Sequence, residues 1–314
     1  MTVRLVSAPA APGQTCREEN AASLRSQVVE GRLTSLALPG SPRRVLVYLP
    51  PSYERADTAR ERYPAVYLLH GGFGRAQDWV RLGRVSRILD RLAAEQRIPE
   101  CIAVMPDAGS PGPARRWRFS NAYDRQLQYE DFVVHDLVKW VDQNFQTFPT
   151  PQYRLSAGIA EGAEAAVHMA LRHPSVFAGC VGMSGGYGLG SDRELRDLLG
   201  DGLGASRRLA GRGALQRCED LADWLSRLRY VFTCGWLDPS IGHALALHRL
   251  LDEFRVAHTF RTYLGSGGWG RWRAGLAGAL CELLSTHGTP AERCRHHADQ
   301  VSDQAGLIAP RSKA

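Results

Sequence analysis

The stretch YRLSAGIAEGAEAAVHMALRHP, residues 153–174, decides the fold. A short lead-in of mixed polar and apolar residues meets two glycines, Gly158 and Gly162, and a helix-forming run then extends to Pro174. Glycine permits a tight turn, and a helix ends before a proline. The stretch therefore predicts a strand, a sharp turn and a helix, with Ala160 at the centre of the turn.

Strand and helix patterns alternate along the rest of the chain. Residues 28–54 predict an antiparallel hairpin around a Pro-Gly turn. Strands are then predicted in YPAVYLLHGGFG, where the strand runs into a glycine-rich loop, and in CIAVMPDA, FAGCVGMSGGYG, YVFTCGWLD and HTFRTYLG. Helices are predicted in VSRILDRLAAEQRIP, YEDFVVHDLVKWVDQNF, IGHALALHRLLDEF and GWGRWRAGLAGALCELLSTH. Strands that are apolar throughout favour an α/β fold with a mostly parallel sheet and helices on both faces.

The predicted sheet also predicts where the site lies. Parallel sheets bind ligands at the carboxyl ends of their strands. Segments expected to meet there are 70–74, 106–110, 158–162 and 234–238. We expect one domain at residues 28–287, between an N-terminal arm at 1–27 and a polar tail at 288–314. Residues 108–128 predict an irregular loop, and residues 190–227 a polar helical cover of the sheet.

Composition narrows the class of protein. The 314 residues are 44% hydrophobic and 23% charged, as in ordinary globular chains. No run of 18 apolar residues and no apolar leader are present, so we expect no membrane span and no signal peptide. Seven scattered cysteines without C-x-x-C pairs indicate reduced thiols and a cytoplasmic location. Metal-ligand spacing is absent, His296–His297 in the tail included, so we predict no metal and no cofactor.

The net charge of +7 and the pI of about 9.2 have two interpretations. One is nucleic-acid binding, and the other is an arginine-rich composition with no such role. The arginines are interleaved with acidic residues, and no helix carries a basic stripe with stacking aromatics. We therefore predict no nucleic-acid partner.

Several motifs, in order, resemble one known family. These are VYLPPSYE, RYPAVYLLHGGFGRAQDW, ILDRLAAEQRIPECIAVMPDA, YEDFVVHDLVKWVDQNF and GIAEGAEAAVHMALRHPSVFAGCVGMSGGY. Together they are similar to the esterase D and enterochelin-esterase-like family, which includes feruloyl esterases and mycolyltransferases. The resemblance covers roughly residues 28–286. It implies an α/β-hydrolase fold and ester hydrolysis or acyl transfer by a Ser–Asp–His triad.

The resemblance places the three triad positions on this chain. The nucleophile position, the centre of G-x-S-x-G, falls on Ala160 in GIAEG. The acid position falls on Asp238 in TCGWLD. The family histidine stands in a segment like tyrosine–proline–glycine–glycine–histidine–aspartate–tryptophan, which is YLGSGGW here, so its position falls on Gly267, with Trp269 retained. Losing serine and histidine together indicates a natural departure from the family, since one engineered change suffices to abolish such a triad.

The resemblance also implies that the oxyanion loop is kept. In LLHGGFG the glycines let backbone amides face the pocket, with Gly72 as the best-matching donor and the amide of Glu161 as the second. Phe73 follows in the same loop, and His70 precedes it. His70 supports the loop in the family, although a role as base stays open. The pocket could thus still bind a carbonyl oxygen or an anion.

Two carboxylates are candidates for acid–base chemistry. Glu161 follows the turn centre, where a partly buried carboxylate could act as general acid or base. Its alternative role is a first-turn acidic residue that complements the helix dipole. Asp238, without its histidine, could serve the same chemistry or merely accept backbone hydrogen bonds in a loop.

Other residues are candidates for lining the pocket. Ser184 is the centre of a second G-x-S-x-G, GMSGG, as a pocket residue or an alternative nucleophile. Trp79, Arg116, Trp117 and Trp269 are expected around the mouth, with Trp272 and the neighbouring arginines Arg115 and Arg118; the alternative is an exposed basic loop. His243 and His248 are expected as surface or packing residues.

Three functions remain open. The first is a repurposed, non-hydrolytic enzyme that cyclises, isomerises, epimerises or eliminates a carbonyl-containing or anionic small molecule, using Glu161 or Asp238. The second is a binding or scaffold pseudoenzyme without turnover. The third is a residual ester hydrolase that uses Ser184 or an attacking water. A homodimer is allowed, and no membrane partner is expected.

Overall fold

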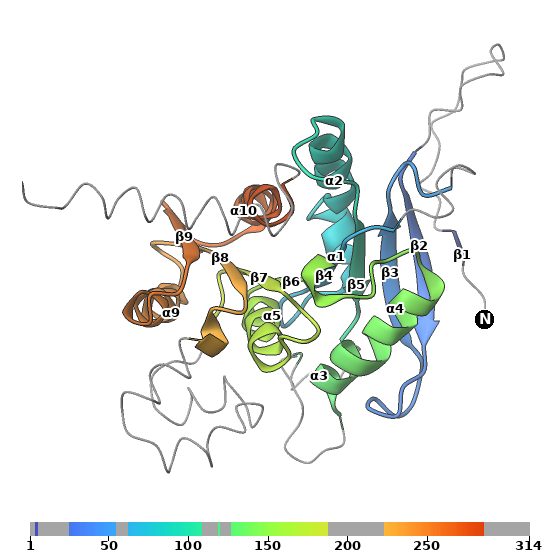
Figure 1. Cartoon of the computed structure of the whole chain (residues 1–314), viewed down its shortest axis with the longest axis horizontal. Coiled ribbons are helices and arrows are strands. Elements are labelled where there is room, and N and C mark those ends of the chain that lie inside the picture. Colours follow the sequence, from blue (N-terminus) through green and yellow to red (C-terminus); the bar gives the residue numbers. More distant parts are fainter. Residues whose placement is uncertain are drawn as a thin grey trace, which may run out of the picture.

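A computed structural model describes residues 4–5, 25–54, 62–108, 119, 127–187 and 223–285 of the chain (Figure 1). Among these residues, nine strands form one sheet in the order β1-β2-β3-β5-β4-β6-β7-β8-β9. The strands are β1 (Arg4–Leu5), β2 (Gln27–Leu33), β3 (Arg43–Leu49), β4 (Ala65–Leu69), β5 (Ile102–Pro106), β6 (Arg154–Ile159), β7 (Gly179–Met183), β8 (Arg229–Gly235) and β9 (His258–Tyr263).

The sheet is antiparallel at one edge and parallel elsewhere. β2 and β3 form the predicted hairpin, with Val29 opposite Val47, and β3 runs antiparallel to β5. From β5 through β4, β6, β7 and β8 to β9, every neighbouring pair is parallel. The predicted α/β fold with a mostly parallel sheet is confirmed. Strands β4 to β7 are buried along their whole length, which explains their unbroken apolar pattern.

Helices cover both faces of the sheet (Figure 1). They are α1 (Ala76–Arg81), α2 (Val85–Ala94), α3 (Tyr129–Asp131), η2 (Phe132–Leu137), α4 (Val138–Asn144), η3 (Pro151–Tyr153), α5 (Glu161–Arg172), α9 (Ile241–Glu253) and α10 (Trp269–Leu284). Leu89 of α2 and Leu280 of α10 belong to one apolar cluster, and Val167 of α5 and Leu247 of α9 belong to the other. The two clusters are the two sides of the sheet.

The helix expected over residues 129–145 is not a regular α-helix. Its middle, η2, is a π-helical segment between α3 and α4. Phe132, Val133, Val134 and Leu137 are all buried there. Because a π turn is wider than an α turn, it places more consecutive residues against the core than an amphipathic α-helix can. The apolar residues are inside as predicted, but the backbone that places them is different.

Three of the predicted segments fall mostly or wholly outside the residues that the structure describes. Most of 108–128 and nearly all of 190–227 lie outside them, as does the tail 288–314. Within the arm, Arg4–Leu5 forms an edge strand that pairs with Glu30 and Val29, which the sequence did not predict. None of the described helices has the length and the apolar run needed to cross a bilayer.

Candidate functional site

The turn between β6 and α5 has the geometry of a nucleophile elbow. Ala160 stands at its centre with φ 50° and ψ −119°, a backbone conformation that residues other than glycine rarely adopt. A Cβ atom on Gly158 would lie 2.1 Å from the Gly162 carbonyl oxygen, and one on Gly162 would lie 2.3 Å from the Leu69 oxygen. Both glycines are therefore needed for β6, α5 and β4 to approach this closely.

Glu161 points back from the elbow to the loop that follows β4. Its Oε2 accepts a hydrogen bond of 2.8 Å from the Gly72 amide. A Cβ on Gly72 would lie 2.8 Å from the Glu161 carboxyl carbon, so only glycine allows this contact. In this structure the chain's own carboxylate thus occupies the Gly72 amide, the donor that we expected to face the pocket.

The His70 side chain connects the same loop to the segment after β5. The Ala108 amide donates to His70 Nε2 over 3.1 Å, so the proton is on Nδ1, which donates to the Gly71 carbonyl over 2.8 Å. The side chain is buried, and burial lowers the pKa of His70, which keeps the ring neutral. With both nitrogens engaged by backbone groups, His70 has the supporting role and not that of a base or a substrate contact.

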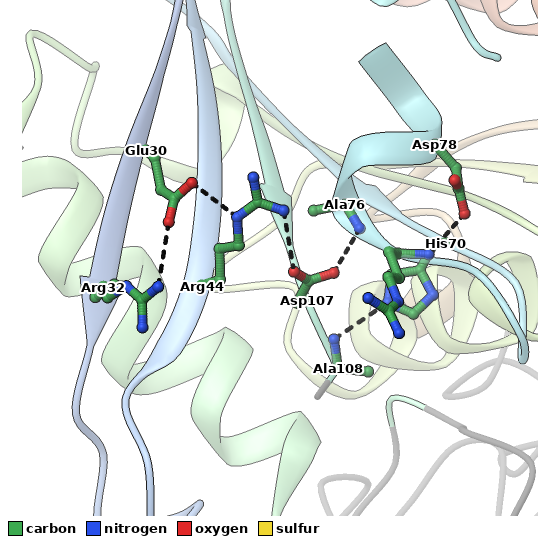
Figure 2. Close-up of polar contacts among 9 residues, drawn as sticks. Glu30, Arg32, Arg44, His70, Ala76, Asp78, Asp107 and Ala108 are labelled. Atoms are coloured by element: carbon green, nitrogen blue, oxygen red, sulfur yellow. Dashed lines mark hydrogen bonds and ion pairs between the residues drawn. The ribbon is translucent and has the colours of Figure 1, made fainter. Parts of the chain in front are cut away.

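Asp107, which we did not single out from the sequence, braces the loop from β5. Figure 2 shows its carboxylate between the loop and strand β3. Oδ1 accepts a 2.6 Å hydrogen bond from the Ala76 amide at the start of α1, and Oδ2 lies 4.0 Å from an Arg44 guanidinium nitrogen. Arg44 in turn donates to Glu30 over 2.9 Å. The sequence signal that could have indicated this role is the position of Asp107, an acidic residue directly after a buried strand in MPDA.

Asp238 and Gly267 lie side by side, as the resemblance implies for an acid and its histidine. The Gly267 amide donates to Asp238 Oδ2 over 3.0 Å, and the Ser240 amide and hydroxyl donate to Oδ1 over 2.9 and 2.6 Å. Burial raises the pKa of Asp238, but hydrogen bonds led by those from Ser240 outweigh this, so the pKa is lowered. Asp238 is a stably ionised acceptor that anchors two loops.

Ser184 and Trp272 fill the space beside Gly267. The Trp272 indole donates to Ser184 Oγ over 3.0 Å, and Ser184 also bonds the Asp238 carboxylate. A Cβ on Gly267 would lie 2.6 Å from Ser184 Oγ and 3.1 Å from the Trp272 ring. A histidine could not enter here without displacing these side chains. Trp272 therefore belongs to the site itself, which sequence reasoning placed only at its mouth.

The predicted aromatic mouth is only partly seen. Trp79 is 1% exposed and packs edge-on against Trp269 with ring centroids 5.4 Å apart, so it is a core residue and its expected place at the mouth is wrong. Phe73 is 83% exposed on the oxyanion loop. Arg116 and Trp117 lie outside the described residues, as do Arg115 and Arg118.

Exposed apolar side chains that we did not predict follow two strands at the same edge. Trp236 and Leu237 come after β8, and Leu264 comes after β9; their exposed fractions are 51%, 77% and 82%.

The arrangement brings the predicted groups together with altered chemistry. Ala160 places a methyl group at the centre of the turn, and the Glu161 carboxylate accepts a hydrogen bond from the Gly72 amide, which the resemblance assigns as the oxyanion donor. The position that the resemblance assigns to the histidine, residue 267, is a glycine in this chain. A carboxylate beside an oxyanion donor can exchange a proton with a bound carbonyl compound.

Comparison with protein families finds a match for half of the chain. The model of the family described as "Putative esterase" matches residues 35–193. This range contains the oxyanion loop, the elbow and Ser184. Asp238 and Gly267 lie beyond it.

Curated relatives share part of the chain. An endo-1,4-beta-xylanase/feruloyl esterase of Xylanibacter ruminicola is 29% identical over 149 residues, which are 47% of this chain and 20% of that protein. An esterase of Mycobacterium tuberculosis is 32% identical over 151 residues, again 47% of this chain and 30% of that protein. The matches thus span less than a third of these relatives.

Solved structures share the fold over most of the chain. A ferulic acid esterase has a TM-score of 0.69 at 24% identity, with 83% of this chain and 98% of that chain covered. An S-formylglutathione hydrolase of Staphylococcus aureus has a TM-score of 0.61 at 18% identity, with 83% and 100% covered. Both likenesses place the sheet and its helices among α/β-hydrolase folds.

Proposed function

The chain belongs to the esterase family whose model matches residues 35–193, and from that premise we propose that it is a repurposed, non-hydrolytic member. In this proposal a carbonyl-containing small molecule binds at the elbow, and Glu161 moves a proton on it. The reaction class is isomerisation, epimerisation, elimination or cyclisation through an enolate.

One observation carries the proposal, namely the 2.8 Å hydrogen bond from the Gly72 amide to Glu161 Oε2. A substrate carbonyl oxygen that takes over this amide displaces the carboxylate but leaves it tethered beside the bound molecule. A carboxylate that loses its donor becomes a stronger base. The site thus holds a donor for a developing enolate oxygen and a base next to it.

The proposed reaction begins with a proton transfer from the substrate to Glu161. Glu161 takes a proton from the carbon next to the carbonyl, and the electron pair of that C–H bond moves onto the carbonyl oxygen held by Gly72. The enolate then collapses by taking a proton back at another face or position, by expelling a leaving group, or by attacking an electrophilic carbon of the same molecule. No covalent bond to the protein forms, which agrees with a methyl group at Ala160.

Asp238 is the weaker candidate for the base. Hydrogen bonds from Ser240, Ser184 and Gly267 hold it ionised, and a carboxylate with a lowered pKa is a poor proton acceptor. In the proposal it keeps the loops after β8 and β9 in place. Ser184 is equally committed, since its hydroxyl bonds both Trp272 and Asp238. A residual hydrolase that uses Ser184 is therefore disfavoured.

A second candidate function is a binding protein without turnover. The same Glu161–Gly72 hydrogen bond would then be a permanent closure of the oxyanion loop. Trp272 and Ser184, which fill the space beside Gly267, favour this alternative. The two candidates differ in whether Glu161 leaves Gly72 when a ligand binds.

The ligand class follows from the site and the relatives. An oxyanion donor selects a carbonyl or a carboxylate oxygen, and one relative is named an endo-1,4-beta-xylanase/feruloyl esterase, a name that refers to an aromatic acyl group. Phe73, Trp236 and Leu264 offer apolar contacts at the same edge. We propose an apolar or aromatic acyl compound, and the reaction uses protein groups alone.

Solvent exchange tests the proposal. The full chain is incubated in D2O with aryl methyl ketones and with phenylacetyl thioesters of N-acetylcysteamine, and deuterium beside the carbonyl is measured by mass spectrometry. We expect incorporation above the buffer rate, and Glu161→Gln to lower it by about 10²–10⁴-fold. Glu164→Gln, in the same first turn of α5, is the control and should retain the rate.

A fluorophosphonate probe applied to the same preparations separates the alternatives. We expect no labelling, because Ala160 has no nucleophile. Exchange at the buffer rate with retained ligand binding would favour the binding protein, and labelling at Ser184 would favour the hydrolase. Equal exchange by wild type and Glu161→Gln would remove Glu161 from the mechanism.

A further inference from the structure

Three metal-ligating side chains meet where α9 ends and β9 begins. His248 and Asp252 are one turn apart on α9, and His258 is the first residue of β9. One possible ligand atom from each residue lies within 4.8 Å of the other two. The cluster is at the amino end of β9, whereas the elbow and Asp238 follow the carboxyl ends of strands. It is therefore separate from the candidate site described above.

His258 is held in the orientation of a metal ligand. Its side chain is only 4% exposed, and its Nδ1–H donates to the Val256 carbonyl over 2.8 Å. This fixes the proton on Nδ1 and turns the lone pair of Nε2 toward the cluster. A backbone carbonyl that orients a ligating histidine in this way is typical of protein metal sites.

The other two ligands come from the solvent side. His248 Nδ1 lies 2.6 Å from His258 Nε2, and His248 Nε2 lies 3.4 Å from Asp252 Oδ2. Asp252 Oδ1 is 3.8 Å from His258 Nε2. The side chains of His248 and Asp252 are 35% and 61% exposed, so an ion can enter from water and keep water as its remaining ligand.

We infer that His248, Asp252 and His258 bind a divalent transition-metal ion, with Zn²⁺ as the best match to two imidazoles and one carboxylate. Bonds of about 2.0–2.1 Å in a tetrahedral site place ligand atoms about 3.3 Å apart. The two nearest nitrogens must therefore separate and the carboxylate must approach, which the exposed Asp252 and the half-buried His248 allow. The competing occupant of the same position is a proton shared between the imidazoles.

The ion would fasten α9 to β9. No backbone ladder joins a helix to a strand, and the two elements are linked by a short turn in which Arg255 has φ 54°. β9 ends at Tyr263, and the chain then reaches Gly267 in the candidate site. The ion would therefore also hold in place the strand that leads to this site. Binding to the folded state alone raises stability as the free ion concentration exceeds the dissociation constant.

Calorimetric titration with Zn²⁺ tests the inference on the full chain without an affinity tag, after removal of metals by a chelator. We expect one ion per chain, a higher melting temperature, and a visible d–d absorption band when Co²⁺ replaces Zn²⁺. Asp252→Asn changes an exposed side chain and His248→Gln a half-buried one, and each should weaken binding at least 10-fold while the apo protein stays folded. His258→Ala should abolish binding.

Two controls use histidines that are not in the cluster. His243→Ala changes an exposed position of the same helix, and His296→Ala with His297→Ala removes the adjacent pair in the tail. Both should bind Zn²⁺ as the wild type does. Absence of one-to-one binding, binding that follows His296 and His297, or affinity unchanged in Asp252→Asn and His248→Gln would overturn the inference.

Discussion

Ala160 adopts a backbone conformation that suits glycine better than alanine. Its φ of 50° and ψ of −119° are imposed by the close approach of Gly158 to Gly162 and of Gly162 to Leu69. Such strain costs of order 1–3 kcal/mol and persists only where the surroundings determine it. The turn between β6 and α5 is thus held in a strained conformation with an alanine at its centre.

Relief of this strain gives the first stability prediction. Ala160→Gly should raise the free energy of unfolding by about 1 kcal/mol, because the new residue adopts the turn without strain. Ala165→Gly, in the middle of α5, should instead lower it by about 1 kcal/mol or more through the helix propensity of glycine and lost burial. Urea unfolding measures both. Loss of stability in Ala160→Gly equal to that in Ala165→Gly would contradict a strained elbow.

At the scale of single residues, the sequence predicts which residues occupy the site better than it predicts where their side chains point. Ala160, Asp238 and Gly267 follow from the order of motifs, and the structure places the last two in contact. The direction of Glu161 could not be predicted, because its partner Gly72 is 89 residues earlier in the chain. The burial of Trp79 was missed for the same reason, since its ring packs on Trp269 of a distant helix.

At the scale of elements, Glu130 fastens the short helix α3 to the end of α5. Its carboxylate is buried and accepts hydrogen bonds from Arg172 Nη1 over 2.6 Å and from His173 Nε2 over 2.9 Å. Burial raises the pKa of Glu130, but His173 and Arg172 outweigh it, so the pKa lies below its ordinary value. The ionised form is therefore favoured by folding.

The sign of the pH dependence follows from this lowered pKa. The ionised Glu130 stabilises the fold fully above the ordinary glutamate pKa of about 4.3, and this stabilisation is lost as the pH falls through the lower folded value. Glu130→Gln should cost about 1–3 kcal/mol at pH 7. The difference from wild type should shrink below about pH 4.3, as urea unfolding at pH 7 and pH 3 measures.

Asp131→Asn, at the neighbouring position, is the matched control for Glu130→Gln. It should leave the pH dependence of stability between pH 7 and pH 3 closer to that of wild type than Glu130→Gln does, because it keeps the carboxylate that Arg172 and His173 contact. A difference between Glu130→Gln and wild type that stayed constant from pH 7 to pH 3 would show that the charge of Glu130 is not what fastens α3 to α5.

Element types were largely predictable from periodicity, and the exceptions have physical reasons. Buried parallel strands give continuous apolar runs, and the hairpin has alternation and a Pro-Gly turn. The π-helical segment η2 was not predictable, because its apolar residues also fit an α-helix of the same length. β1 was missed because two residues carry no periodicity and pair only through the backbone of β2.

At the scale of the whole molecule, the parallel topology brings distant segments to one edge of the sheet. Gly72 follows β4, Glu161 begins the helix after β6, and Asp238 follows β8. This convergence was predictable from strands that alternate with helices. Packing within the edge was not predictable, because it depends on contacts such as that of Trp272 with Ser184. A cytoplasmic location and a homodimer stay predictions.

The central claim is that the Glu161 carboxylate accepts the hydrogen bond of the Gly72 amide, where a substrate oxygen would otherwise accept it. The amide proton shift of Gly72, in a ¹H–¹⁵N NMR spectrum of the full chain, reports this hydrogen bond directly. We predict that Glu161→Ala moves the Gly72 signal to a lower proton shift, whereas Glu164→Ala leaves it in place. A Gly72 signal unchanged by Glu161→Ala would contradict the account.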